Sequence, residues 1–302
     1  MTDPKRVQAN GIDIAYLEAG PDDGPLALCL HGFPDHAPTW QHLMPELAAA
    51  GYHVVAPWLR GYSPTGLAPD DNYQVAAVAL DALALADELG GDRDAVLIGH
   101  DWGAIAAYTA VGHRPERFSK LVTMAVPHQA ALMARFLSTP AQLKRSWYIF
   151  FFQTPLAELI VPGDDFAVID MLWRDWSPGL VPDPGFMRDL KATLGAPGST
   201  AAAISYYRSM LGTKPGDPAL DAIQAAGNGP TPVPTLYLHG ADDGCMGVEL
   251  VVEDEMQPFF PAGLDIEIVP ASGHFLHLDQ PEAVNRLVLD FLLSEISPAR
   301  PS

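Results

Sequence analysis

The sequence predicts an α/β protein whose mostly parallel sheet is covered by helices on both faces. Strand and helix patterns alternate up to residue 126, and several strand patterns are almost wholly apolar, which is typical of strands buried on both faces. The alternation stops near residue 130 and resumes at residue 234. The simplest interpretation is a core of residues 1–130 and 231–302, into which residues 131–230 are inserted as a helical cap.

The first part of the core opens with a predicted hairpin, because Asn10-Gly11 stands between two short strand patterns and favours a tight turn. Glycines at positions 51 and 90 mark the ends of two predicted helices. In chain order we predict strands at residues 7–9, 12–17 and 26–30, a helix at 39–50, a strand at 53–56, a helix at 74–89, a strand at 95–98, a helix beginning just past residue 103, and a strand at 120–126.

The predicted cap contains aromatic-rich helical segments and no convincing strand pattern. These segments lie at residues 147–152, 166–176 and 199–211, separated by turns rich in proline and glycine. The second part of the core follows, with strands at residues 234–238 and 264–269 and a closing helix at 281–293. The chain is therefore expected to form one α/β core interrupted by a helical insertion.

Composition narrows the classes of function. The chain of 302 residues has 37 acidic and 17 basic residues and a net charge of −20, which disfavours binding to nucleic acid or to an anionic membrane. Its two cysteines, Cys29 and Cys245, form no disulfide framework, and Cys29 is predicted to be a small core residue. The first residues lack the apolar run of a signal peptide, and no apolar span is long enough to cross a bilayer. We expect a soluble cytoplasmic protein.

The stretch around Asp101 carries the clearest chemical signal. The buried strand pattern at residues 95–98 is followed by Gly99-His100-Asp101-Trp102-Gly103 and then by helix-forming alanines. This is the nucleophile-elbow pattern Gly-x-Asp-x-Gly, with aspartate where serine is commoner. A Cβ on either glycine would collide with the neighbouring strand or helix. We predict that Asp101 is a carboxylate nucleophile that attacks a strained or activated carbon and forms an alkyl ester.

Hydrolysis of such an ester needs a base and a group that orients the base. His274 follows the last predicted strand, which is the place of the histidine in the chain order nucleophile, acid, histidine. His277 and His239 are rival candidates, each with a hydrogen-bonded structural role as its default. The orienting acid is expected in the turn after the preceding strand, where spacing favours Asp243 and leaves Asp242 as the alternative.

An oxyanion hole is expected from two backbone N–H groups. One belongs to Trp102, the residue after the nucleophile, and the other to Phe33 in the loop His31-Gly32-Phe33-Pro34. Ser63 lacks the second glycine of an elbow and precedes a proline, so we interpret it as a turn residue.

Together these residues resemble an α/β-hydrolase-fold epoxide hydrolase, and the resemblance covers nearly the whole chain. It implies an α/β-hydrolase fold, a mostly parallel sheet flanked by helices, with a helical cap. The motifs that carry it are His31-Gly32-Phe33-Pro34-Asp35, Gly99-His100-Asp101-Trp102-Gly103-Ala104, the turn at residues 240–244, and Gly273-His274-Phe275. One departure is Trp58, where many members have an aspartate two residues before the arginine of this turn; it touches no catalytic role.

The resemblance also implies two cap tyrosines that hydrogen-bond the epoxide oxygen. Tyr148 lies a few residues before Phe152-Gln153, and Tyr207 lies in an aromatic-Tyr-Arg segment, with Tyr206 as its alternative. A phenol can hydrogen-bond or protonate the alkoxide that develops as the ring opens. Aromatic cap residues are expected to line an apolar substrate site: Trp147, Phe150, Phe151, Trp173 and Trp176.

The nearest rival is a haloalkane dehalogenase, which would use the same aspartate and the Trp102 indole N–H as a halide ligand. That family often has asparagine at the Phe33 position and lacks the paired tyrosines, so both features count against it. Trp147, Trp173 or Trp176 could still supply a second N–H. A serine esterase is disfavoured because no Gly-x-Ser-x-Gly occurs, and a non-catalytic receptor is disfavoured because all three triad residues are present.

The expected partners are an epoxide and water. We expect that the protein uses no metal and no organic cofactor, and that it binds neither nucleic acid nor a membrane. The sequence leaves open whether the protein is a monomer or a homodimer.

Overall fold

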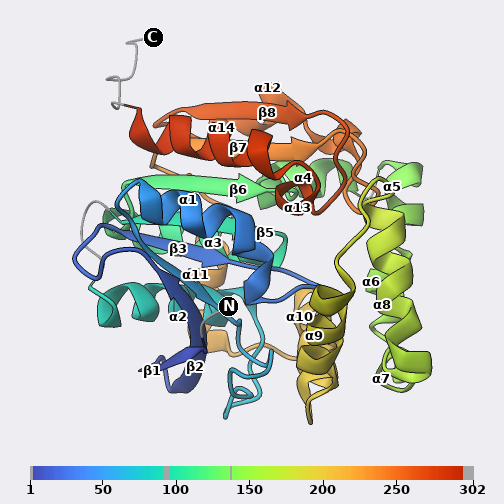
Figure 1. Ribbon diagram of the computed structural model, residues 1–302. Coiled ribbons are helices and arrows are strands. Elements are labelled where there is room, and N and C mark those ends of the chain that lie inside the picture. Colours follow the sequence, from blue (N-terminus) through green and yellow to red (C-terminus); the bar gives the residue numbers. More distant parts are fainter. Residues whose placement is uncertain (1–2, 91–94, 137, 295–302) are drawn as a thin grey trace.

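A mostly parallel sheet forms the centre of the computed structural model, which describes residues 3–90, 95–136 and 138–294 (Figure 1). Within these residues the sheet has eight strands in the order β1-β2-β4-β3-β5-β6-β7-β8. The antiparallel pairs are β1 with β2 and β2 with β4, and the other neighbours pair in parallel. The predicted α/β class is confirmed. The strands are β1 (Lys5–Ala9), β2 (Ile12–Ala19), β3 (Leu26–Leu30), β4 (His53–Pro57), β5 (Val96–His100), β6 (Lys120–Met124), β7 (Thr235–Gly240) and β8 (Leu264–Val269).

The antiparallel edge begins with the predicted hairpin. Asn10 and Gly11 have φ values of 47° and 75°, and positive φ at both central residues is what the favoured two-residue turn requires. Ala9 pairs with Ile12 across the turn. The parallel strands β3, β4, β5 and β6 are buried along their whole length, which explains their largely apolar patterns.

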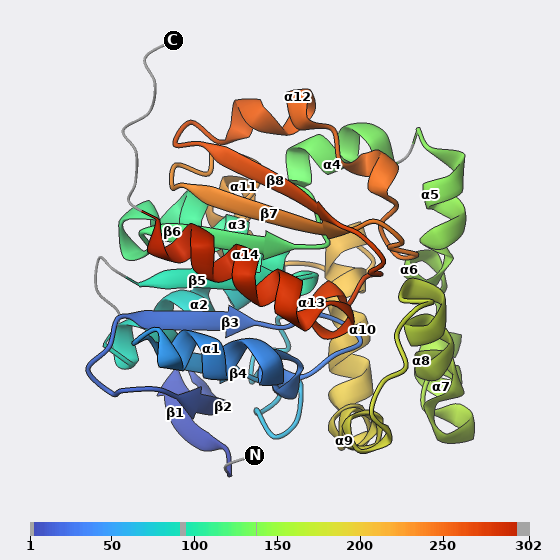
Figure 2. The same ribbon diagram turned by 45° about the horizontal axis from the view of Figure 1, so that its top comes forward.

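Helices cover both faces of the sheet, as the alternating pattern predicts. α1 and α14 pack against each other on one face, and α2 and α3 pack against each other on the opposite face (Figure 2). The core helices are α1 (Leu43–Ala49), α2 (Val75–Glu88), α3 (Trp102–His113), α12 (Glu253–Met256), α13 (Leu276–Asp279) and α14 (Pro281–Leu293). Short 3₁₀ helices are η1 (Ala37–His42), η2 (Pro115–Arg117), η3 (Pro218–Leu220), η4 (Val248–Leu250) and η5 (Gln257–Phe259).

The chain between β6 and β7 is helical. Helices α5 to α10 gather beyond the carboxyl ends of the parallel strands, on the right of Figures 1 and 2. α11, which also falls in the predicted insertion, packs against α2 and α3 of the core instead. The helices of this stretch are α4 (Gln129–Phe136), α5 (Pro140–Arg145), α6 (Trp147–Phe151), α7 (Leu156–Ile160), α8 (Gly163–Trp176), α9 (Pro184–Gly195), α10 (Ser199–Leu211) and α11 (Asp221–Ala226).

Some predicted elements coincide with the structure and others differ in length. The predictions at residues 26–30, 199–211, 264–269 and 281–293 match β3, α10, β8 and α14. The helix predicted at 39–50 is wrong in its first part, which is the 3₁₀ helix η1 with a proline in its first turn. The strand predicted at 120–126 ends at Met124 because Ala125 has a φ of 69°, outside the extended region. Predictions at residues 1–2, 91–94, 137 and 295–302 lie outside the described residues.

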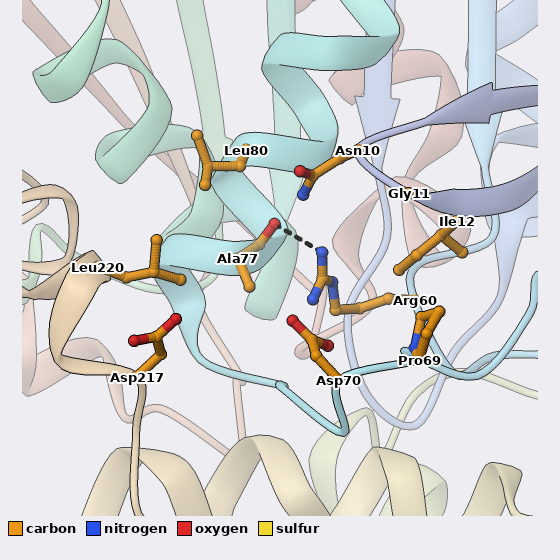
Figure 3. A pocket seen from close by; sticks show the side chains of 10 residues that line it. All are labelled: Asn10, Gly11, Ile12, Arg60, Pro69, Asp70, Ala77, Leu80, Asp217 and Leu220. Carbon is orange, nitrogen blue, oxygen red and sulfur yellow. Dashed lines mark hydrogen bonds between the residues drawn. The ribbon is translucent and has the colours of Figure 1, made fainter.

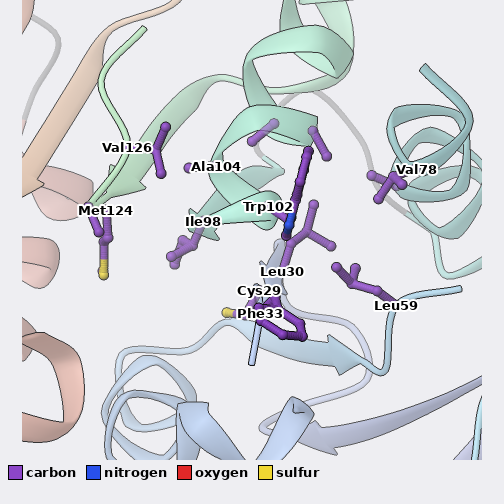
Figure 4. Close-up of a cluster of buried hydrophobic side chains, with 14 of the residues drawn as sticks. Cys29, Leu30, Phe33, Leu59, Val78, Ile98, Trp102, Ala104, Met124 and Val126 are labelled. Atoms are coloured by element: carbon purple, nitrogen blue, oxygen red, sulfur yellow. The ribbon is translucent and has the colours of Figure 1, made fainter. Parts of the chain in front are cut away.

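Apolar packing continues from the sheet into the helices between β6 and β7. Figure 4 shows Phe33 and Trp102 among core side chains such as Leu30, Ile98 and Met124. Phe33 is 1% exposed and Trp102 is 3% exposed. The backbone on which these two side chains stand is therefore fixed by the packed core. Among the described residues, no helix combines the length and the apolar composition needed to cross a membrane.

Candidate active site

Asp101 lies in the sharp turn between β5 and α3. Its backbone has φ 52° and ψ −117°, a conformation that few residues other than glycine adopt. The turn is possible because glycines flank it. A Cβ on Gly99 would lie 2.4 Å from the carbonyl oxygen of Gly103, and a Cβ on Gly103 would lie 2.1 Å from the carbonyl oxygen of Leu30. The predicted strand–elbow–helix geometry is present.

The two carboxylate oxygens of Asp101 face different partners. Oδ1 accepts a hydrogen bond from the backbone N–H of Phe33 at 2.7 Å, and Oδ2 lies 3.6 Å from Nε2 of His274. Gly32 permits the approach, because a Cβ there would lie 2.3 Å from the Asp101 Cβ. Burial opposes ionisation of Asp101, but His274 and the Phe33 N–H outweigh it and lower the pKa of the carboxyl. Asp101 is therefore a carboxylate at neutral pH.

His274 is oriented by Asp243 and not by Asp242. Its Nδ1 lies 3.0 Å from Oδ2 of Asp243, whose other oxygen accepts the backbone N–H groups of Cys245 and Met246 at 2.7 and 2.8 Å. Asp242 is exposed. Burial lowers the pKa of His274, but Cys245, Asp243 and Asp101 outweigh burial and hold that pKa well above its usual value.

The rival histidines, His239 and His277, form hydrogen bonds with other residues. His239 bonds the hydroxyl of Tyr237 at 2.6 Å and the carbonyl of Met246 at 2.9 Å. His277 bonds the hydroxyl of Thr39 at 2.6 Å. Burial lowers the pKa of both imidazoles, so both stay neutral at pH 7. These contacts favour structural roles for the two residues.

The predicted tyrosines, one on α6 and one on α10, lie together. The rings of Tyr148 and Tyr207 are 5.6 Å apart, and the Tyr207 ring packs 5.3 Å from Phe33 and 4.9 Å from Trp102. The Tyr207 hydroxyl is buried and has no hydrogen-bond partner among the described residues. Tyr206, in contrast, donates to the carbonyl of Arg60 at 2.8 Å. The geometry favours Tyr207 over its neighbour.

The aromatic residues predicted to bind substrate occupy different environments. The Trp173 indole N–H donates to the carbonyl of Pro34 at 2.8 Å, and its ring stacks on Phe275 at 3.8 Å. Phe151 is half-buried beside Trp147. Trp147 is 40% exposed, and its ring lies 6.5 Å from that of Tyr148.

Sequence reasoning assigned no site role to Cys245 or to the main chain at the end of α8. The carbonyl of Trp176 accepts the backbone N–H groups of Gly244 at 3.0 Å and of His274 at 2.9 Å. This contact joins the end of α8 to the two loops that carry Asp243 and His274. A main-chain contact of this kind has no side-chain signature, so no sequence pattern could reveal it.

Possible metal ligands come together in two buried groups whose ligand atoms lie within 4.8 Å of one another. One comprises Asp35, His100 and His277, and the other comprises Asp243, Cys245 and His274. In the second group Asp243 and His274 already bond each other. The chemistry derived below needs neither group to hold a metal.

A surface pocket of about 260 Å³ lies beside the β1–β2 turn and α2 (Figure 3). Arg60 reaches into its wall, but the guanidinium is already paired with Asp81 at 2.6 Å and with the carbonyl of Ala77 at 3.1 Å. With Asp70 and Asp217 also in the lining, the pocket offers no free cation to an anionic ligand. Arg60 instead contacts α10, since its carbonyl accepts the Tyr206 hydroxyl.

Known proteins resemble the chain along almost its whole length. Residues 27–287 match the alpha/beta hydrolase family. The chain is 34% identical to "Epoxide hydrolase 3" of Xenopus tropicalis, covering 95% of this chain and 76% of the relative, and 32% identical to "Epoxide hydrolase 4" of Homo sapiens, covering 96% and 78%. A solved structure from hot-environment metagenomes, titled as one of several novel epoxide hydrolases, superposes with a TM-score of 0.82 at 27% identity, covering 98% of this chain and 100% of that one.

These likenesses extend through the elbow, the loops that carry Asp243 and His274, and the helices that carry both tyrosines. Because they span the chain from end to end and not the core alone, this protein belongs to the alpha/beta hydrolase family and, within it, to the epoxide hydrolases.

Proposed function

We propose that the enzyme is a hydrolase acting on the ether bond of an apolar epoxide, which it converts to a vicinal diol through a covalent ester on Asp101. Oδ2 of Asp101 attacks the less hindered epoxide carbon, and the carbon–oxygen bond of the ring breaks. Oδ1 stays on the Phe33 N–H, where it already lies. The charge of the nucleophile passes to the departing epoxide oxygen.

Tyr148 and Tyr207 hold that oxygen as the ring opens. Burial raises the pKa of both phenols well above the usual value, so both keep their protons at neutral pH and can donate. A donor aimed at a developing alkoxide stabilises the transition state more than the ground state. The alkoxide takes a proton from one of the two phenols, which becomes a phenolate, and a hydroxyalkyl ester of Asp101 results.

Ester formation prepares His274 for the second step. The Asp101 carboxylate helps to raise the pKa of His274, and the ester carries no charge, so this contribution disappears. His274 then takes a proton from water, and the hydroxide attacks the ester carbonyl. The N–H groups of Phe33 and Trp102 bind the resulting oxyanion, and Asp243 stabilises the imidazolium. The bond between the ester carbonyl and the alkyl oxygen then breaks, the diol oxygen takes the imidazolium proton, and the regenerated Asp101 carboxyl returns a proton to the phenolate.

The observation that carries the proposal is the buried Tyr207 hydroxyl without a partner. An unpaired buried hydroxyl costs stability, and a substrate oxygen above Asp101 would satisfy it. We further propose that residues 131–230 form the cap that encloses the substrate, and that Trp147, Phe151 and Trp173 contribute to its apolar site.

A dehalogenase is the second candidate, and one observation favours it. The Trp102 indole N–H is buried and has no hydrogen-bond partner among the described residues, so it could hold a halide. A dehalogenase also needs a second N–H donor for the halide, and the structure offers none at two expected places. The Trp173 N–H already donates to the carbonyl of Pro34, and Phe33 carries no side-chain donor.

A paired assay of the purified protein tests the two candidates. One arm offers styrene oxide and measures diol, and the other offers a bromoalkane and measures released bromide. Diol without bromide is the expected result. Bromide without diol would show that the tyrosines pack the cap and that Trp102 is a halide ligand.

We also propose a cytoplasmic location, because both cysteines are free buried thiols. The partners proposed are the epoxide and water, with no metal, organic cofactor, nucleic acid or membrane, and with the protein acting as a monomer or a homodimer.

A further inference from the structure

Cys245 is a buried thiol to which the proposed reaction gives no role. It lies two residues after Asp243 in the turn after β7 and is 1% exposed. Its Sγ is 3.3 Å from the hydroxyl oxygen of Tyr148, within hydrogen-bonding distance for sulfur. Its backbone N–H donates to Oδ1 of Asp243 at 2.7 Å. One residue therefore touches both the cap tyrosine and the carboxylate that orients His274.

Gln142 holds Cys245 in place by a hydrogen bond to its backbone carbonyl. Gln142 belongs to α5 and is 0% exposed. Its Nε2 donates to the carbonyl of Cys245 and to the hydroxyl of Ser146, each at 2.8 Å, and its Oε1 accepts the N–H of Gly247 at 3.0 Å. Ser146 directly precedes α6, which carries Tyr148. The thiol and the phenol are therefore held on one shared frame of hydrogen bonds.

The two tyrosines differ in their partners. The Tyr207 hydroxyl has no partner among the described residues, whereas the Tyr148 hydroxyl has the thiol. Burial raises the pKa of Cys245, so the sulfur keeps its proton and can donate it. If the S–H donates to the phenolic oxygen, the phenolic O–H is left free to point at a substrate. A chain of two hydrogen bonds also polarises the second one.

We propose that Cys245 is a positioning residue whose thiol donates to the Tyr148 oxygen and thereby aims the Tyr148 O–H at the epoxide oxygen. The inference rests on the proposed function and extends it. No proton leaves the sulfur at any step: the S–H···O bond persists while Tyr148 hydrogen-bonds the departing oxygen. Through the Tyr148 bond, Cys245 acts on ring opening.

The first test separates the two steps with rapid-quench mass spectrometry of the Asp101 ester. Cys245→Ala should lower the rate of ester formation about five- to tenfold, the value of one neutral hydrogen bond. Its rate of ester hydrolysis should change less than its rate of ester formation. Cys245→Ser keeps a donor and should restore most of the lost rate. A serine variant as slow as the alanine variant would overturn the inference.

A double-mutant cycle shows whether Cys245 acts through Tyr148. In a Tyr148→Phe background Cys245→Ala should cause no further loss, because the acceptor is already gone. In a Tyr207→Phe background it should cause its full loss. An equal loss in both backgrounds would mean that the thiol merely packs or serves Asp243, and the inference would fail.

An infrared measurement reports the contact without turnover. The S–H stretching band of Cys245, assigned by its loss in Cys245→Ala, should move to higher frequency in Tyr148→Phe, while the band of the remote buried Cys29 stays in place. An unmoved Cys245 band would overturn the inference. A wild-type protein that forms no diol, but whose Cys245 band moves, would refute the proposed function while leaving the thiol–phenol hydrogen bond intact.

Discussion

The His274 imidazole lies between two carboxylates, with Nε2 3.6 Å from Asp101 and Nδ1 3.0 Å from Asp243. While both are charged, they help to hold the pKa of His274 well above its usual value, against the effect of burial. A protonated imidazole cannot act as a base. Conversion of Asp101 to a neutral ester removes one of the contributions that raise the pKa of His274, and so favours the unprotonated base in the second step of the proposed reaction.

We predict that His274→Gln traps the ester. Nucleophilic attack by Asp101 does not need the base, whereas hydrolysis does, and loss of a general base slows a step by roughly 10²- to 10⁴-fold. Intact-mass spectrometry in the presence of styrene oxide should show the protein plus one substrate. Asp101→Asn is the control, since it removes the nucleophile and should show no adduct. An adduct of the same yield in both variants would contradict the assignment of Asp101.

Adjacent tyrosines provide a matched pair for a second prediction. Tyr207→Phe should lower the rate of ring opening by roughly 10²-fold through loss of a donor to the alkoxide, with little change in stability. Tyr206→Phe should leave kcat nearly unchanged and lower the free energy of unfolding by about 1–2 kcal/mol, because its buried hydrogen bond to Arg60 is lost. Diol kinetics and thermal melts of both variants check this, and the reverse pattern would assign the catalytic hydroxyl to Tyr206.

At the scale of the element, the elbow depends on how closely β5, α3 and the end of β3 approach. The missing Cβ of Gly103 leaves room for the carbonyl of Leu30, and that of Gly32 leaves room for the Asp101 side chain. The strained φ of 52° at Asp101 persists because these contacts define it from both sides. The elements thus hold the nucleophile against the Phe33 N–H before substrate arrives.

We predict that Gly103→Ala destabilises the protein by more than about 3 kcal/mol, because the new Cβ would lie 2.1 Å from a backbone oxygen that cannot yield. Gly163→Ala, at the start of α8, is the matched control. Its Cβ would meet no atom within 4 Å, so its stability should stay close to that of the wild type. Denaturant unfolding of the two variants measures the difference, and comparable stabilities would show that the elbow relaxes more easily than its geometry implies.

At the scale of the whole molecule, cap and core together bury the site. Asp101 is 6% exposed, and Tyr148 and Tyr207 are each 2% exposed. Exclusion of water strengthens the hydrogen bonds to the developing alkoxide and protects the ester from untimely hydrolysis. The same burial places many histidines in apolar surroundings, which makes the stability of the fold depend on pH.

Buried neutral histidines should make the fold sensitive to acid. Burial lowers the pKa of His31 and His128 to about 4 and of His36 and His100 to about 3. Unfolded histidines titrate near 6.5, so below that pH the unfolded chain binds more protons and stability falls, by about 1.4 kcal/mol per pH unit for each residue. Asp35, whose pKa burial raises to about 8, acts with the opposite sign, as do Asp81 and Asp279, whose pKa values burial also raises. Six histidines with lowered pKa values stand against these three carboxyls.

Melting temperatures between pH 7 and pH 4.5 should therefore decline steeply. His36→Phe should flatten the decline, because that ring packs against Phe186 and would no longer titrate. A melting temperature independent of pH over this range would contradict the burial argument.

The sequence by itself determined the fold class, the hairpin, the buried strands, the elbow at Asp101 and the place of His274. These follow from local patterns: apolar period, turn residues, and glycines spaced around one aspartate. The sequence also favoured Tyr148 and Tyr207, but only through resemblance, because tyrosines in aromatic helices are more often packing residues.

Only the tertiary structure decided between neighbours. Asp243 contacts His274 and Asp242 does not, and, among the described residues, Tyr207 keeps an unpaired hydroxyl whereas Tyr206 does not. Neighbouring residues in a turn or a helix point in different directions, so a shift of one position decides which side chain enters the site. The contact of Cys245 with Tyr148 joins residues 97 positions apart. Contacts between a core loop and a cap helix exist only once the chain has folded, so no local pattern could specify them.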